Sequence, residues 1–69
     1  MSLTNRLKEL RLQNDLTQEA LGQSVSVTRQ TVIAIEKGGY VPSVKLALEF
    51  AGALGVPLEQ VFWLEGPDQ

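Results

Sequence analysis

The sequence contains no cysteine and no histidine among its 69 residues. Their absence excludes a disulfide framework and the Cys/His zinc sites that stabilise many small domains, and it removes the commonest acid–base side chain of catalysis. No close pair of carboxylates is apparent. The Gly38-Gly39 pair follows a predicted helix, whereas a phosphate-cradling glycine loop would precede one. We therefore expect no enzyme activity, no cofactor and no metal.

Long apolar runs are also missing. No segment approaches the roughly 20 apolar residues that a membrane-spanning helix needs. The N-terminus has no basic region followed by an apolar run, so no export signal is predicted. The lack of cysteine fits a reducing compartment. These features predict a soluble, cytoplasmic protein, and the length predicts a single domain over residues 1–69.

Basic residues are few and unevenly placed, in a chain with a formal net charge of −2. Residues 1–45 hold all six basic side chains and four acidic ones, whereas residues 46–69 hold four acidic side chains and no basic one. Such asymmetry indicates an electropositive working face and a separate acidic back. Chance in a short chain is the alternative explanation.

The main pattern in the sequence is a helical periodicity of apolar residues, interrupted by residues that begin or end helices. This pattern predicts five short helices at about residues 5–13, 17–24, 28–37, 43–54 and 57–62, and hence an all-α fold. The predicted N-caps are Thr4, Thr17, Thr28 and Ser43. Gly38-Gly39 and Gly55 end the third and fourth helices. Only the C-terminal tail carries a competing, strand-like pattern.

Apolar side chains along these helices predict the core. Leu3, Leu7 and Leu10 share one face of the first helix, and Leu21 points inward from the second. The fourth helix is expected to be more buried than amphipathic, with a stripe of Val44, Ala47, Ala51 and Leu54 that is widened by Leu46, Leu48 and Phe50.

The stretch VTRQTVIAIEKG, residues 27–38, gives the third predicted helix two distinct faces. At 100° per residue Val32 and Ile35 point toward the core. The outer side carries Arg29, Gln30, Ile33 and Ala34. Arginine can pair with guanine and glutamine with adenine, and an aliphatic side chain can contact the thymine methyl group. The outer face is therefore predicted to contact bases in the major groove of DNA. Simple solvation of its polar residues is the alternative.

Helix N-termini predict a second set of DNA contacts, because their free N–H groups and positive dipole end favour phosphate. The predicted phosphate-contacting residues are Thr17, Gln18, Thr28, Thr31, Lys37 and Arg11. Capping alone is the alternative role of the threonines. A solvated face of the first helix is the alternative for Arg11, as it is for Arg6 and Lys8.

Four segments, LTQEALG, VTRQT, AIEKGGYVPS and LALEFAGALGVPLEQVF, follow one another between residues 16 and 62. In order and spacing they resemble a Cro/C1-type helix-turn-helix domain of the Xre family, most closely its short stand-alone members. The resemblance implies a five-helix, lambda-repressor-like fold with the helix-turn-helix at about residues 17–37. It also implies a homodimeric transcriptional regulator, expected to be a repressor, that binds a two-fold operator in double-stranded DNA.

The resemblance also assigns residues. It matches base-facing positions to Arg29, Gln30, Ile33 and Ala34, and phosphate-facing positions to Gln18, Thr28 and Thr31. The chain departs from the family pattern at several positions. Ser26 replaces a turn glycine, at a cost of about 1 kcal/mol if its φ is positive. Gly22 replaces an alanine, at about 1 kcal/mol of helix propensity. Glu49 and Gly52 stand where lysine is frequent, and Val41 stands where a polar loop residue is usual.

The C-terminal segment is more apolar than a monomer of this size can easily cover. A dimer interface is predicted at Leu58, Val61, Phe62, Trp63 and Leu64. In the resembling short regulators, the end of the fifth helix and the tail lie at the two-fold axis. This arrangement places the two third helices about 34 Å apart, one turn of DNA. Closure of the monomer core is the alternative, expected for Phe62 but not for Trp63.

A protein-binding module is the alternative function. In that case an antitoxin-like chain or adaptor would hold a basic protein partner against its acidic half, while its helix-turn-helix binds the promoter that the two share.

Overall fold

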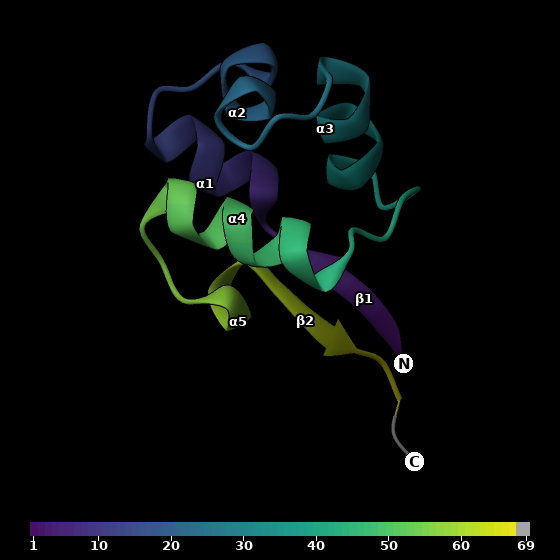
Figure 1. Ribbon diagram of the computed structural model, residues 1–69. Coiled ribbons are helices and arrows are strands. Elements are labelled where there is room, and N and C mark those ends of the chain that lie inside the picture. The colour runs from purple at the N-terminus through teal and green to yellow at the C-terminus, as the bar shows by residue number, and fades with distance from the viewer. Residues whose placement is uncertain (68–69) are drawn as a thin grey trace.

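The computed structural model describes residues 1–67, which form five α-helices and one two-stranded antiparallel sheet (Figure 1). In chain order the elements are β1 (Ser2–Asn5), α1 (Leu7–Gln13), α2 (Gln18–Ser24), α3 (Arg29–Glu36), α4 (Val44–Leu54), α5 (Leu58–Val61) and β2 (Phe62–Glu65). The prediction of five helices is confirmed, as is the strand-like tail. No helix in the described part of the chain is long and apolar enough to cross a membrane.

The helices enclose a small core. In Figure 1, α2 and α3 lie together at one end of the molecule, α4 crosses the middle, and the sheet lies at the other end. The largest fully buried side chains are Phe50, Leu7, Leu21, Ile35, Val32 and Val61. The rings of Phe50 and Phe62 are tilted at 50° with their centroids 6.5 Å apart. Full burial of one such side chain contributes about 1.5–3 kcal/mol, so these few contacts carry much of the stability of the domain.

Three of the four predicted N-caps are confirmed. The side-chain oxygens of Thr17, Thr28 and Ser43 accept hydrogen bonds from the backbone N–H groups of Ala20, Thr31 and Leu46, at 2.9, 3.2 and 3.1 Å. Each bond satisfies one of the N–H groups that have no partner inside the first turn of a helix. Gly55 ends α4 with a left-handed φ of 71°, as expected.

The start of the first helix was predicted wrongly. The helix begins at Leu7, and Thr4 lies in β1 without capping anything. The N-cap of α1 is Arg6, whose side chain makes no capping bond, and the Leu7 backbone N–H donates instead to Asn5 Oδ1 at 3.0 Å. Leu3 consequently leaves the helix face that it was predicted to share, and 38% of it is exposed.

The reason for this difference lies at the other end of the chain. β1 pairs with β2 in an antiparallel register that sets Leu3 opposite Leu64, Thr4 opposite Trp63 and Asn5 opposite Phe62. The Arg6 backbone N–H extends the pairing to the carbonyl of Val61 at 3.0 Å. We call this two-stranded sheet the terminal ribbon. It also ends α5 at Val61, one residue earlier than predicted.

The predicted apolar stripe of α4 is only partly buried. Val44 and Leu48 are 73% and 52% exposed, whereas the other members of the stripe are buried. At 100° per residue, the buried positions of the helix span one arc, and Val44 and Leu48 fall just beyond its edge. The two side chains therefore form an apolar row that the rest of the described chain leaves uncovered.

Two departures from the family pattern, Ser26 and Gly22, lie at or against the turn between α2 and α3. Ser26 has a φ of 62°, so the expected cost of a side chain in the left-handed region applies, at about 1 kcal/mol. A Cβ on Gly22 would lie only 2.7 Å from the carbonyl oxygen of Val27. The glycine therefore permits a backbone approach that even an alanine would disturb.

Candidate nucleic-acid interface

The α3 helix has the two faces that its sequence predicts. Val32 and Ile35 are buried in the core, whereas Arg29 and Gln30 are exposed on the opposite side. Ile33, with Ala34, is partly exposed beside them. The core contacts fix the rotation of the helix about its axis. The outer face is consequently held in one orientation, with a cationic, an amide and an aliphatic group side by side.

Hydroxyl groups at the start of α3 leave one donor free. Thr28 Oγ1 accepts from the backbone N–H of Thr31 at 3.2 Å, and the two threonine hydroxyls lie 3.1 Å apart. Each hydroxyl carries one proton. One of the two protons serves the bond between the hydroxyls, and the other can be donated outward. This pair can therefore both cap the helix and hold an oxygen of a bound anion.

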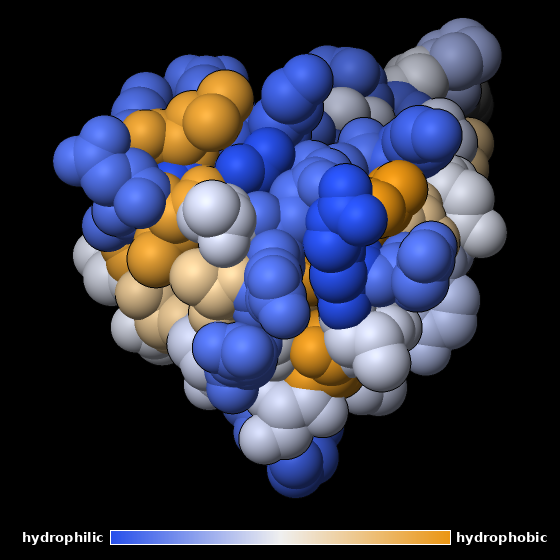
Figure 2. All heavy atoms as spheres, turned by 90° about the horizontal axis from the view of Figure 1, so that it is seen from above, coloured by the Kyte–Doolittle hydropathy of each residue, from blue (hydrophilic) through white to orange (hydrophobic). Residues whose placement is uncertain are grey.

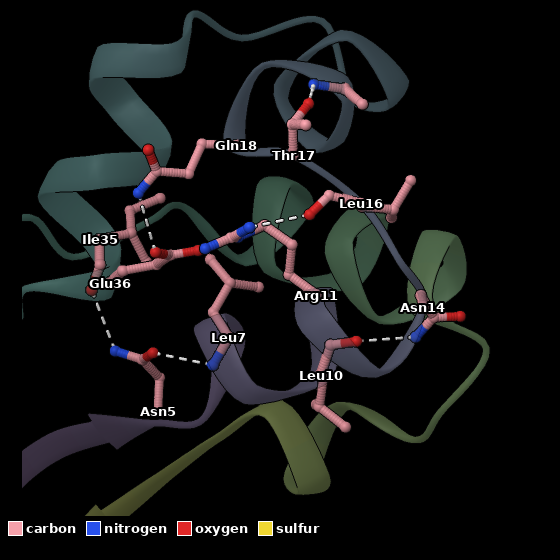
Figure 3. Close-up of polar contacts among 11 residues, drawn as sticks. Asn5, Leu7, Leu10, Arg11, Asn14, Leu16, Thr17, Gln18, Ile35 and Glu36 are labelled. Carbon is pink, nitrogen blue, oxygen red and sulfur yellow. Dashed lines mark hydrogen bonds and ion pairs between the residues drawn. The ribbon is translucent and has the colours of Figure 1, made fainter.

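A buried ion pair links α1 to the end of α3 (Figure 3). Arg11 Nε donates to Glu36 Oε2 at 2.8 Å, and Arg11 Nη1 donates to the carbonyl of Leu16 at 2.8 Å. Arg11 is only 7% exposed. The structure thus places Arg11 mainly inside the chain, as a group that holds two helices and a linker together, and not on an open helix surface.

Glu36 also reaches α2. Its Oε1 accepts a hydrogen bond from Gln18 Nε2 at 3.1 Å, so both carboxylate oxygens are occupied (Figure 3). Asn5 Nδ2 donates to the carbonyl of the neighbouring Ile35 at 3.0 Å. Gln18, the first residue of α2, is therefore positioned by the last residue of α3. We call Arg11, Gln18 and Glu36 the polar triad.

The other predicted phosphate contacts lie at the surface. Thr17 is exposed at the start of α2, and Lys37 is exposed just after α3. Lys37 thus stands at the opposite end of α3 from Arg29, about 12 Å away along an eight-residue helix. Viewed from above α2 and α3, the surface is mostly hydrophilic, with smaller apolar patches between the polar side chains (Figure 2).

A polar hollow of about 480 Å³ opens where α1 meets the starts of α2 and α3. Its lining residues are Lys8, Arg11, Thr17, Gln18, Glu19 and Arg29. Sequence reasoning placed Lys8 on a solvated helix face and gave it no role. Its spacing of three residues from Arg11 was the available signal, because residues three apart lie on the same side of a helix.

The predicted dimer residues divide into two groups. The side chains of Val61 and Phe62 are buried within the chain itself and are covered without a partner, and the expectation that Phe62 closes the core is confirmed. Leu58 and Trp63 are partly exposed and Leu64 is 61% exposed. Trp63 carries the Arg6 guanidinium over its ring at 5.3 Å, which covers part of its apolar surface.

An apolar hollow of about 310 Å³ lies beside the terminal ribbon. Besides the tail, its lining includes Leu3, Val41 and Val44, which sequence reasoning had not connected to it. Val41 is 70% exposed. These residues and Leu58, Trp63 and Leu64 form what we call the apolar face. The apolar face could not be recognised from the sequence, because the pairing of β1 with β2 sets Leu3 beside Leu64, and the packing of α4 and α5 brings the other members to them.

Known proteins share this architecture. A helix-turn-helix family model matches residues 7–61. The uncharacterized HTH-type transcriptional regulator YgzD of Bacillus subtilis is 56% identical over 63 residues, 91% of this chain and 96% of YgzD. The cryptic phage CTXphi transcriptional repressor RstR of Vibrio cholerae is 29% identical over 58 residues, 84% of this chain and 52% of RstR.

The same likeness holds in three dimensions. The crystal structure of the restriction-modification controller protein C.AhdI from Aeromonas hydrophila matches with a TM-score of 0.75 and 33% sequence identity, over 80% of each chain. The chain belongs to the helix-turn-helix family, as a short transcriptional regulator of the Cro/C1 type.

Proposed function

We propose that the protein represses transcription by binding a two-fold site in double-stranded DNA as a homodimer, with α3 in the major groove. One observation carries the proposal: Arg29 and Gln30 are exposed on a helix whose opposite side is anchored in the core. The major groove is about 12 Å wide and accepts a helix. Repression is the function that the name of RstR states, and it fits a chain whose described part offers little beyond the DNA-binding fold.

The side chains of α3 suggest which base edges are contacted. Arg29 can donate two hydrogen bonds to guanine, and Gln30 can exchange two with adenine. Ile33 can contact a thymine methyl group, and the short Ala34 leaves room for a base edge to approach. Each two-bond pair supplies about 1–3 kcal/mol of discrimination against a wrong base.

Phosphate contacts would orient the helix in the groove. Thr17 and Gln18 lie at the start of α2, and Thr28 and Thr31 supply the free hydroxyl donor at the start of α3. Lys37 stands at the far end of α3 and can meet the phosphates across the groove. Such contacts set position but carry no sequence information, so they should matter equally on every duplex.

The apolar face supports the homodimer. Leu3, Val44 and Leu64 are exposed around one hollow, which gives this face both projecting side chains and a recess. A two-fold contact requires such self-complementarity, because the same surface must serve on both subunits. The operator would then present half-sites about 34 Å apart. Such a regulator would act in the cytoplasm, where bacterial and archaeal chromosomes lie.

Selection of bound duplexes from a randomised pool tests the proposal. We expect enrichment of a two-fold site with half-sites about one turn apart. Gln30→Ala should lose about 1–3 kcal/mol on that site and relax the preference at one base pair per half-site. Gln60→Ala, which removes an exposed glutamine from α5, is the matched control and should bind like the parent.

Two outcomes would contradict this function. If Gln30→Ala bound the selected site as tightly as the parent, Gln30 would not contact a base, and the proposed base-contacting face of α3 would be wrong. If no duplex were enriched, the alternative of a protein-binding module, with the acidic half against a basic partner, would take its place.

A further inference from the structure

Three of the six basic side chains converge on the polar hollow between α1 and the starts of α2 and α3. Lys8 and Arg11 come from α1, and Arg29 is the first residue of α3. Glu19 is the one acidic side chain in the lining. In a chain with a net charge of −2, such a concentration of positive charge stands apart from the average.

Part of the hollow is rigid. Arg11 is nine-tenths buried, and its bonds to Glu36 and Leu16 use two of its five N–H groups. The Gln18 side chain is held by the second oxygen of Glu36. Two polar groups that line the hollow are therefore fixed by contacts behind it. Their remaining donors need no further ordering before an anion binds, which reduces the entropic cost of binding.

The basic side chains at the rim of the hollow are not held by ion pairs in the part of the chain that the structure describes. Lys8 and Arg29 are exposed, and neither takes part in an ion pair within residues 1–67. Because Glu36 already balances Arg11, the unbalanced charge at the hollow comes from Lys8 and Arg29, less that of Glu19. One net positive charge suits a singly charged group such as a phosphodiester.

We infer that this hollow holds one backbone phosphate of the duplex whose major groove receives α3, and that Lys8 is a direct contact to it. The inference rests on the proposed function, because a duplex seated on α3 passes Arg29 and hence the rim. Lys8 adds a flexible point charge on the α1 side, opposite Arg29. Arg29 can then donate to the phosphate with part of its guanidinium, in addition to its proposed contact with a base.

The salt dependence of binding tests the role of Lys8. The logarithm of the binding constant falls linearly with the logarithm of salt concentration, with a slope of about −0.9 for each phosphate neutralised. Lys8→Gln should make the slope shallower by about 0.9 on specific and random duplexes alike. Lys45→Gln is the matched control, since Lys45 is an exposed lysine on α4 that is paired with Glu49. It should leave the slope unchanged.

Uncharged methylphosphonate linkages, placed one at a time along the selected site, identify the phosphate. The parent should lose affinity at one linkage per half-site, and Lys8→Gln should lose less affinity than the parent at that linkage, because the two changes share one contact and their effects are not additive. Glu19→Gln should strengthen binding to every duplex, because it removes a negative charge beside that phosphate. A structural role for Lys8 alone would predict neither result.

The failures of the two proposals are distinguishable. If the parent binds DNA and Lys8→Gln keeps the full slope, the phosphate site is overturned while the function stands. If the methylphosphonate profile of Lys8→Gln is the same as that of the parent, the same conclusion follows. If the parent binds no duplex, the proposed function itself fails.

Discussion

The helix-turn-helix end and the terminal ribbon end of this molecule are stabilised in different ways. At the first, the polar triad satisfies its charged groups within the chain, and Gly22 lets α2 and α3 approach closely. At the second, the ribbon leaves Leu64, along with Val41 and Val44, exposed to solvent. The polar groups of the first end are satisfied within a single chain, whereas the apolar side chains of the second are left uncovered by the described chain. Under the proposed function, this difference means that the geometry of α3 would be set before two copies associate, and that association would set only their spacing.

Loss of the triad should have the largest effect. Glu36→Ala leaves the buried Arg11 guanidinium without its carboxylate and Gln18 without its acceptor. We expect the free energy of unfolding to fall by about 3–5 kcal/mol, as measured by urea unfolding followed by circular dichroism. The double variant Arg11→Met with Glu36→Leu should recover most of that loss, because it removes the charges together. If Glu36→Ala were as stable as the parent, the first end would not depend on the triad.

The close approach of α2 and α3 can be tested by substituting alanine for two glycines, one at this approach and one away from it. Gly22→Ala should lower the free energy of unfolding by about 1–3 kcal/mol, because its Cβ would lie 2.7 Å from the Val27 carbonyl oxygen. Gly52→Ala in α4 meets nothing within 4 Å and should raise the free energy of unfolding by up to about 1 kcal/mol through helix propensity. Thermal unfolding of both variants under one condition measures the contrast. Changes of the same sign would argue against it.

A charge on the apolar face should affect association and leave folding intact. We expect Leu64→Asp to weaken the dimer at least tenfold, about 1.4 kcal/mol, in sedimentation at micromolar concentration. Leu12→Asp changes an exposed leucine of α1, away from that face, and serves as the control. Retention of the parental dimer by Leu64→Asp would show that the apolar face is not the interface.

The sequence predicted correctly those features that depend on residues close together in the chain. The caps at Thr17, Thr28 and Ser43 and the two faces of α3 follow from residues within a few positions of one another, and the structure confirms them. The roles given to Arg29 and Gln30 in DNA binding stay predictions, because burial and exposure do not identify a ligand.

Features that depend on distant residues were missed. The segment SLTN shows no strand pattern of its own and becomes β1 only by pairing with residues 62–65. The burial of Arg11 depends on Glu36, 25 positions away. Val44 and Leu48 are apolar, like the buried residues of α4, so their residue types do not show that they are exposed. Only the packing of the other helices decides which edge of α4 is covered.

The pairing of β1 with β2 also bears on how the protein is made. Ser2 leaves the ribosome well before its partner in the sheet, Glu65. The apolar face, which both strands help to form, therefore cannot be completed until residue 65 has cleared the exit tunnel. A nascent chain lacking that segment would not offer this face to a partner, so the proposed dimerisation could not begin before β2 has been made in each copy.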